Sequence, residues 1–124
     1  MAQKTKEKSG YRAVARYVLI SPPKARRVAD HVRNVRYPQA VAILDNLPHK
    51  AARLLKKVIQ SAAANALYQN KNLDEDMLVV RELLVNEGPR MKRLWYRARG
   101  RADMVLRRMS HITVVVDEIK KAGE

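Results

Sequence analysis

The chain has 124 residues, which fits one domain with a modest hydrophobic core. The absence of cysteine excludes disulfides, a thiol nucleophile and cysteine-ligated zinc, and no apolar run approaches the ~18 residues of a transmembrane helix. The formal net charge is +14, so we expect a polyanionic partner. The first residues, MAQKTKEKSG, lack the apolar core of a secretory signal, and a cytosolic location is therefore expected.

The positive charge is concentrated in the two ends of the chain. Residues 1–36 hold ten Lys/Arg and two acids, residues 37–87 hold six of each, and residues 88–124 hold ten and four. This distribution indicates nucleic acid as the partner. A membrane surface is the weaker alternative, because no predicted helix opposes a strong apolar face to a basic one. We expect neither membrane binding nor a homo-oligomer.

Residues 1–10 are polar and lysine-rich and are predicted to form a basic tail ahead of one α+β domain over residues 11–124. The segment 11–20, YRAVARYVLI, has the alternation of a strand. Arg12 and Arg16 are predicted on one face. The apolar face is predicted to hold Tyr11, Ala13, Ala15, Tyr17 and Leu19.

A first helix is predicted after Ser21, which suits the N-cap, with Pro22 in the first helical position. Its apolar stripe consists of Ala25, Val28, Ala29 and Val32. Cations in a first helical turn oppose the helix dipole, so local stability does not explain those found here. We therefore predict that they contact nucleic acid: Lys24, Arg26 and Arg27.

Two further helices are predicted in the neutral middle of the chain. A short one begins near Pro38 and ends before Pro48. The longer one covers HKAARLLKKVIQSAAANALYQN, with a buried face formed by Ala51, Leu55, Val58, Ala62 and Ala66. A second face of this helix could be simply solvated or could contact RNA, and the sequence leaves both open for Lys50, Arg53 and Lys57.

The segments Met77–Val85 and Ser110–Val116 are predicted strands, and the stretch between them could extend both into one long β-hairpin over about residues 77–116. Its tip is predicted at residues 95–102, where Gly100 can adopt a positive φ. Arms of this length would reach about 60 Å, far beyond a body whose radius of gyration is about 14 Å. The predicted fold is α+β: a small three-stranded antiparallel sheet packed with three helices, plus a long protruding β-hairpin.

No catalytic or metal site is predicted, and no cofactor. The three histidines lack metal-ligand spacing, and the acidic run Asp74–Asp76 is typical of an exposed turn. Ser110 and His111 cannot act as nucleophile and base, because neighbours on a strand point to opposite faces.

The stretch Gly88–His111 carries eight basic residues and one acid, and phosphates would relieve the repulsion among them. The predicted RNA-binding set therefore contains Arg12, Arg16 and the helix cations. It also contains the hairpin residues Arg90, Lys92, Arg93, Arg97, Arg99, Arg101, Arg107, Arg108 and His111. For His111 a structural role is the alternative to a phosphate contact. Trp95 and Tyr96 could form a local cluster, but stacking on a base or lining a partner's surface is favoured in a tip without a core.

The run NEGPRMKRLWYRARGRADMVLRRMSHITVVV resembles the signature hairpin of the large-subunit ribosomal protein L twenty-two family. The upstream blocks SPPKARRVAD and VIQSAAANA resemble that family too, so the likeness covers about residues 11–117. Trp95 and Tyr96 depart from the smaller apolar residue and the proline that the family commonly has, which implies a bulkier tip.

The resemblance implies a structural component of the large ribosomal subunit that binds 23S rRNA, contacts neighbouring ribosomal proteins and assists early subunit assembly. It also implies a hairpin tip that lines the nascent-polypeptide exit tunnel, formed by Trp95, Tyr96, Arg97, Ala98, Arg99, Gly100, Arg101 and Ala102. The rival interpretation is a free basic nucleic-acid-binding regulator. Regulators that read sequence usually present a recognition helix or a stacking sheet, and neither is evident in this chain.

Overall fold

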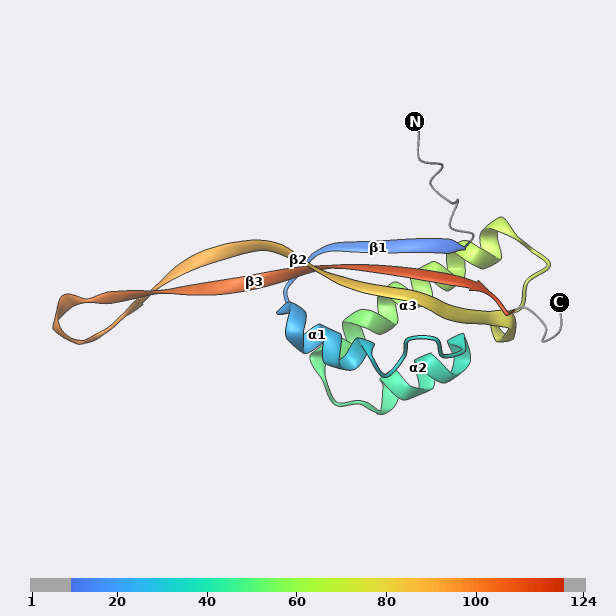
Figure 1. Ribbon diagram of the computed structural model, residues 1–124, viewed down its shortest axis with the longest axis horizontal. Helices are drawn as coiled ribbons and strands as arrows, with labels where there is room; N and C mark the ends of the chain where they lie inside the picture. The colour runs from blue at the N-terminus through green and yellow to red at the C-terminus, as the bar shows by residue number, and fades with distance from the viewer. Residues whose placement is uncertain (1–9, 120–124) are drawn as a thin grey trace, which may run out of the picture.

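The computed structural model describes residues 10–119, so most of the predicted tail and the last five residues lie outside the described part (Figure 1). The strands are β1 (Tyr11–Val18), β2 (Leu78–Tyr96) and β3 (Ala102–Glu118). The α-helices are α1 (Pro22–Ala29), α2 (Tyr37–Asn46) and α3 (Lys50–Gln69), and the 3-10 turns are η1 (Glu75–Met77) and η2 (Ala98–Gly100).

The three strands form one antiparallel sheet in the order β1-β3-β2. All three α-helices lie on one side of it, and β2 and β3 continue together far beyond the helices as a twisted hairpin (Figure 1). The predicted α+β fold with a long protruding hairpin is therefore confirmed.

The hydrophobic core lies between the helices and the inner face of the sheet. Helix α3 presents the face that its spacing predicts, with Leu55 fully buried and Ala51, Val58, Ala62 and Ala66 buried beside it. Strand β3 supplies the facing residues Ile112, Val114 and Val116, which are fully buried. The core stops where the helices stop, so the outer hairpin has no core of its own.

Strand β1 does not keep the predicted alternation to its end. Ala15 pairs with Ile112 and Val18 with Ser110, so two residues of β1 stand opposite His111 in a β-bulge. Tyr17 adopts φ 58° in this bulge. The prediction of an inward-facing Tyr17 and Leu19 is therefore wrong: they are 62% and 55% exposed, and Ile20 enters the core instead.

A second bulge marks the point where the hairpin leaves the body. Glu87 pairs with Ser110 and Arg90 with Arg108, so Gly88 and Pro89 stand opposite Met109 alone. A Cβ on Gly88 would lie 3.2 Å from the Met109 backbone, and Pro89 lacks the N–H that a regular ladder would use. These two residue types are therefore well suited to the bulge.

Beyond this bulge the pairing runs without interruption from Arg90↔Arg108 to Tyr96↔Ala102. The Arg97 N–H donates to the Arg101 carbonyl oxygen at 2.7 Å and closes the tip. Gly100 has φ 69°, in agreement with the predicted turn, and Arg99 shares the left-handed conformation with φ 62°. The positive φ of Arg99 has no signal in the sequence.

Candidate nucleic-acid interface

The outer hairpin is a ribbon exposed on both faces. Every residue from Lys92 to Arg108 is exposed, and no helix covers either strand there (Figure 1). Because strand residues alternate between faces, Lys92, Leu94 and Tyr96 share one face, and Arg93 and Trp95 share the other. Both faces therefore combine cationic residues with exposed apolar ones.

Most of the hairpin cations have no acidic partner within residues 10–119. Arg90 lies 3.6 Å from a Glu87 carboxylate oxygen, and the Arg97 Nε lies 2.8 Å from Asp103 Oδ2. Both ion pairs are exposed and contribute little to stability. The cations without such a partner in the described part of the chain are Lys92, Arg93, Arg99, Arg101, Arg107 and Arg108.

The bulky tip residues are strongly exposed. Trp95 is 60% exposed, Tyr96 is 81% exposed, and Leu94 and Met104 form an exposed cross-strand pair beside them. The tryptophan and tyrosine rings do not stack on another aromatic ring of the described residues. Both rings are therefore exposed to solvent, and their contact with a partner stays a prediction.

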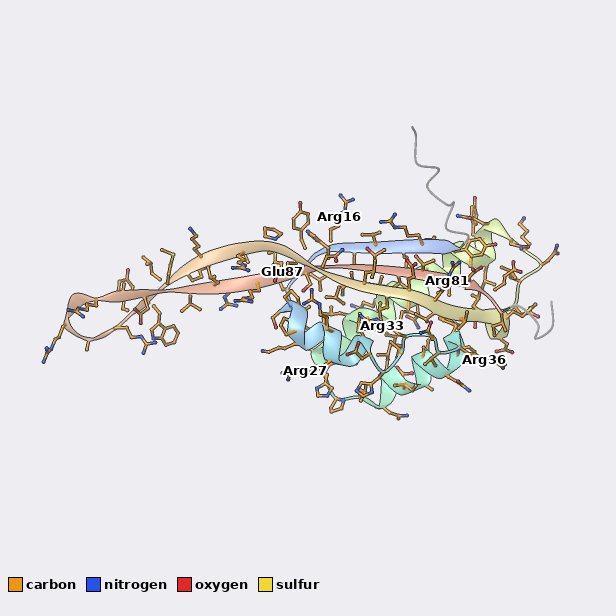
Figure 2. All side chains as sticks on the ribbon, viewed as in Figure 1. Arg16, Arg27, Arg33, Arg36, Arg81 and Glu87 are labelled. Carbon is orange, nitrogen blue, oxygen red and sulfur yellow. The ribbon has the colours of Figure 1, made fainter. Side chains whose placement is uncertain are left out.

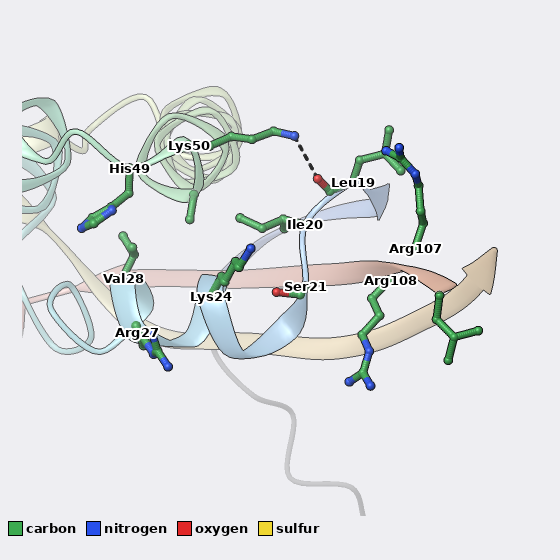
Figure 3. Close-up of a pocket in the computed structure, with 12 residues that line it drawn as sticks. Leu19, Ile20, Ser21, Lys24, Arg27, Val28, His49, Lys50, Arg107 and Arg108 are labelled. Atoms are coloured by element: carbon green, nitrogen blue, oxygen red, sulfur yellow. Dashed lines mark hydrogen bonds between the residues drawn. The ribbon is translucent and has the colours of Figure 1, made fainter. Parts of the chain in front are cut away.

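At the base of the hairpin, a cavity of about 690 Å³ opens between β3, α1 and the start of α3 (Figure 3). Its basic lining residues are Lys24, Arg27, His49, Lys50, Arg107 and Arg108. Four of these belong to the predicted RNA-binding set. His49 and Lys50 complete the group, and the Lys50 Nζ donates to the Leu19 carbonyl oxygen at 3.0 Å.

Arg26 and Arg27 lie in the last turn of α1 and not, as predicted, in its first turn, so the helix-dipole argument does not apply to them. Arg26 also has a structural contact that sequence reasoning missed. Its Nε and one terminal nitrogen donate to the Val85 carbonyl oxygen at 3.2 and 2.9 Å. Arg33 makes a similar contact, with its Nε 3.0 Å from the Leu83 carbonyl oxygen. Both guanidinium groups bind backbone carbonyls of β2, so these two arginines dock helix α1 and the loop after it onto the sheet.

The remaining predicted contacts do not form one patch with the cavity. Arg12 and Arg16 are exposed on β1, and Arg16 projects on the side of the sheet opposite Arg27 (Figure 2). The His111 Nδ1 accepts the Tyr17 N–H at 3.1 Å, and the two rings meet edge to face with centroids 5.1 Å apart. His111 therefore supports the β1 bulge.

Ser110 and His111 do not form a catalytic pair. Ser110 is fully buried and its Oγ donates to the Ile20 carbonyl oxygen at 2.7 Å, whereas His111 contacts Tyr17. Within residues 10–119, no group of three or more His, Cys, Asp or Glu side chains could hold a metal ion, and no helix is both long and apolar enough to span a bilayer.

The fold joins a body that has its own hydrophobic core to a cationic hairpin that has none. The chain is thus a small basic α+β protein. The model of the family described as "Ribosomal protein L22p/L17e" matches residues 13–117 of the chain. The chain therefore belongs to this family and is a structural, non-enzymatic component of the large ribosomal subunit.

Three relatives match almost the whole chain. "Large ribosomal subunit protein uL22" of Treponema denticola is 57% identical over 118 residues, covering 95% of this chain and 98% of the relative. The protein of the same name from Treponema pallidum is 53% identical over 112 residues, 90% of each chain. That of Borreliella burgdorferi is 49% identical over 110 residues, 89% of this chain and 92% of the relative.

Proposed function

We propose that this chain binds 23S rRNA in the cytoplasmic ribosome, supports early assembly of the large subunit, and places its hairpin tip in the wall of the nascent-polypeptide exit tunnel. The observation that carries the proposal is the exposed hairpin, in which six cations have no acidic partner within residues 10–119. Neighbouring ribosomal proteins and the nascent chain would be its other partners.

The physical support for RNA binding is the electrostatics of the ribbon. An isolated two-stranded hairpin is marginal in water, and like charges on both of its faces repel one another. Phosphates packed along the ribbon would offset that repulsion and release counterions from the RNA. The hairpin base, with the adjacent Arg107 and Arg108, would be a phosphate-binding part of this surface.

The test of RNA binding is the salt dependence of affinity for 23S rRNA fragments. Affinity of the wild type should fall steeply with salt, and Arg107→Glu with Arg108→Glu should weaken binding and flatten the plot of log K against log salt. A matched control, Arg36→Glu with Lys71→Glu, reverses two exposed cations on the body. An unchanged slope in the hairpin variant would remove the hairpin base from the interface.

The test of the tunnel proposal is a shift of register. Deletion of Met91–Lys92–Arg93 takes an odd number of residues from one arm, so the side chains beyond the cut change faces and the tip is displaced. Toeprinting on a stalling nascent sequence should then differ from wild type. Ribosomes with Lys71→Glu serve as the control, and identical stalling by ribosomes that contain the deleted protein would make the tip structural only.

A further inference from the structure

We propose that the cavity at the hairpin base is a nucleotide pocket that accepts one unpaired nucleotide of RNA. The inference rests on the proposed RNA binding and adds to it a site and a ligand class. Three segments distant in sequence meet at this cavity: the turn from β1 into α1, the start of α3, and the hairpin base (Figure 3).

The rim of the pocket is suited to a phosphate. Lys24 projects toward the side on which Lys50 lies, and Arg107 lines the same cavity (Figure 3). The contact of Lys50 with the Leu19 carbonyl uses one of its three ammonium donors and holds the charge at the rim. The first turn of α3 has neither a side-chain cap nor an acidic residue, so its positive dipole end faces the same space unneutralised.

The floor of the pocket is suited to a base. Ile20, Val28 and Ala51 line it and are themselves buried, and Leu106 adds a further apolar surface at the hairpin. A volume of about 690 Å³ lies in the usual range of ligand pockets, roughly 300–1,000 Å³. A phosphate alone would leave this apolar surface uncovered, whereas a base would cover it.

These features favour an unpaired nucleotide over a regular duplex. The bases of an RNA duplex are stacked inside it. Its backbone phosphates could contact the rim cations, but no base would fill the cavity. A nucleotide turned out of a bulge or loop presents its phosphate and its base together, and such splayed-out bases are the common target of sequence-specific RNA recognition. The pocket thus distinguishes irregular RNA from continuous duplex.

The experiment measures binding of the full chain to two RNAs, one duplex and the same duplex with a single unpaired nucleotide. We expect the bulged RNA to bind about tenfold tighter, because its base covers apolar surface that a duplex leaves exposed. Leu19→Trp fills the cavity from its exposed rim and should abolish this preference while duplex binding persists. Leu84→Trp, at a residue 46% exposed on β2 and outside the cavity, is the matched control and should retain it.

A second pair of variants tests the rim. Lys24→Gln should reduce the preference for the bulged RNA, and Lys57→Gln, an exposed lysine of α3 outside the cavity, should not. Equal wild-type affinity for the two RNAs, or an undiminished preference in Leu19→Trp, would overturn the pocket while RNA binding stands. Displacement of the bulged RNA by an equimolar nucleoside monophosphate would make it a site for free nucleotides instead. Failure to bind either RNA would overturn the proposed RNA binding together with the pocket.

Discussion

Two neighbouring arginines of helix α1 differ in their surroundings. Both side chains are exposed, but Arg26 donates two hydrogen bonds to the Val85 carbonyl oxygen, whereas Arg27 lines the cavity. A charged donor bound to a partly buried carbonyl stabilises the fold, and an exposed cation without such a contact contributes little. Arg26 therefore docks α1 onto the sheet, whereas Arg27 remains available to a ligand.

The difference predicts effects of different size on the free energy of unfolding for Arg26→Met and Arg27→Met. The first should lower the free energy of unfolding by about 1–2 kcal/mol, because it removes the contact with β2 and leaves the Val85 carbonyl with one partner fewer. The second should change it by less than about 0.5 kcal/mol. Urea denaturation of both variants measures the difference, and equal losses would show that the Val85 contact does not hold α1 in place.

Tyr37, at the start of α2, is the source of a predicted pH dependence at the alkaline end. Burial raises the pKa of Tyr37 above its usual 10.0, Glu75 raises it further, and Lys56 opposes them. As pH rises, the unfolded chain releases this proton first, so the contribution of Tyr37 to stability is full below about pH 10 and is lost as pH rises through the folded-state pKa. Tyr37→Phe should abolish that loss.

The measurement is the free energy of unfolding of wild type and Tyr37→Phe between about pH 8 and 11. The difference in the free energy of unfolding between the two proteins should change above about pH 10. Taking this difference cancels the titration of the residues that both proteins share. Tyr68→Phe is the control, because Tyr68 is 83% exposed and makes no core contact of this kind. Parallel curves for wild type and Tyr37→Phe would contradict the attribution.

At the scale of elements, the body and the outer hairpin differ in what holds them. Helix α3 buries a complete face against the sheet, and Leu55→Ala should lower the free energy of unfolding by about 2–5 kcal/mol because Leu55 is fully buried. Beyond Arg90 the hairpin has ladder hydrogen bonds but no buried side chain. It can open without exposing any core.

Hydrogen exchange on the free chain should show this difference directly. Amides of Leu55, Val58 and Ala62 should exchange slowly, and those of residues 95–102 rapidly, because the tip opens without disrupting the core. The amides of Val114 and Val116, which lie in the same strand β3 but in the body, are an internal control and should be protected. Protection of the tip equal to that of Val114 would mean that the hairpin is stable without RNA.

The element predictions that succeeded rest on local patterns. Proline at a helix start and an apolar face at helical spacing locate α1 and α3 within the chain, and the flanking valine-rich runs locate β2 and β3. The bulge of β1 leaves no such pattern. It depends on the contact of Tyr17 with His111, 94 residues later, and a period of two in the sequence cannot show where one extra residue enters a strand.

The candidate site was predictable in charge and not in shape. The density of cations between Arg90 and Arg108 is visible in the sequence, and so is the scarcity of acids there, because Asp103 is the one acid among them. The cavity is not visible in the sequence, because Lys50 and Arg107 line it together only once strand β3 has folded back beside α1. For the same reason the sequence could not separate Arg26 as a docking residue from the other cations of α1.

At the scale of the whole molecule, the fold divides stability and charge between two regions. The body has a closed hydrophobic core and an almost neutral middle segment, and the hairpin has a large share of the positive charge with no core behind it. A chain built in this way is suited to a larger, negatively charged assembly, as the proposed RNA binding requires. Membership of the ribosomal protein L22p/L17e family accounts for such an assembly in the large ribosomal subunit.

The central claim, that RNA of the large subunit binds and retains this chain, is tested most directly by sucrose-gradient fractionation of cell extracts at physiological salt. The amount of the chain is measured by quantitative mass spectrometry against 23S rRNA in each fraction. We predict one copy per large subunit, which co-sediments with the subunit. Recovery of the chain at the top of the gradient, or in the large-subunit fractions at a small fraction of one copy, would contradict the account.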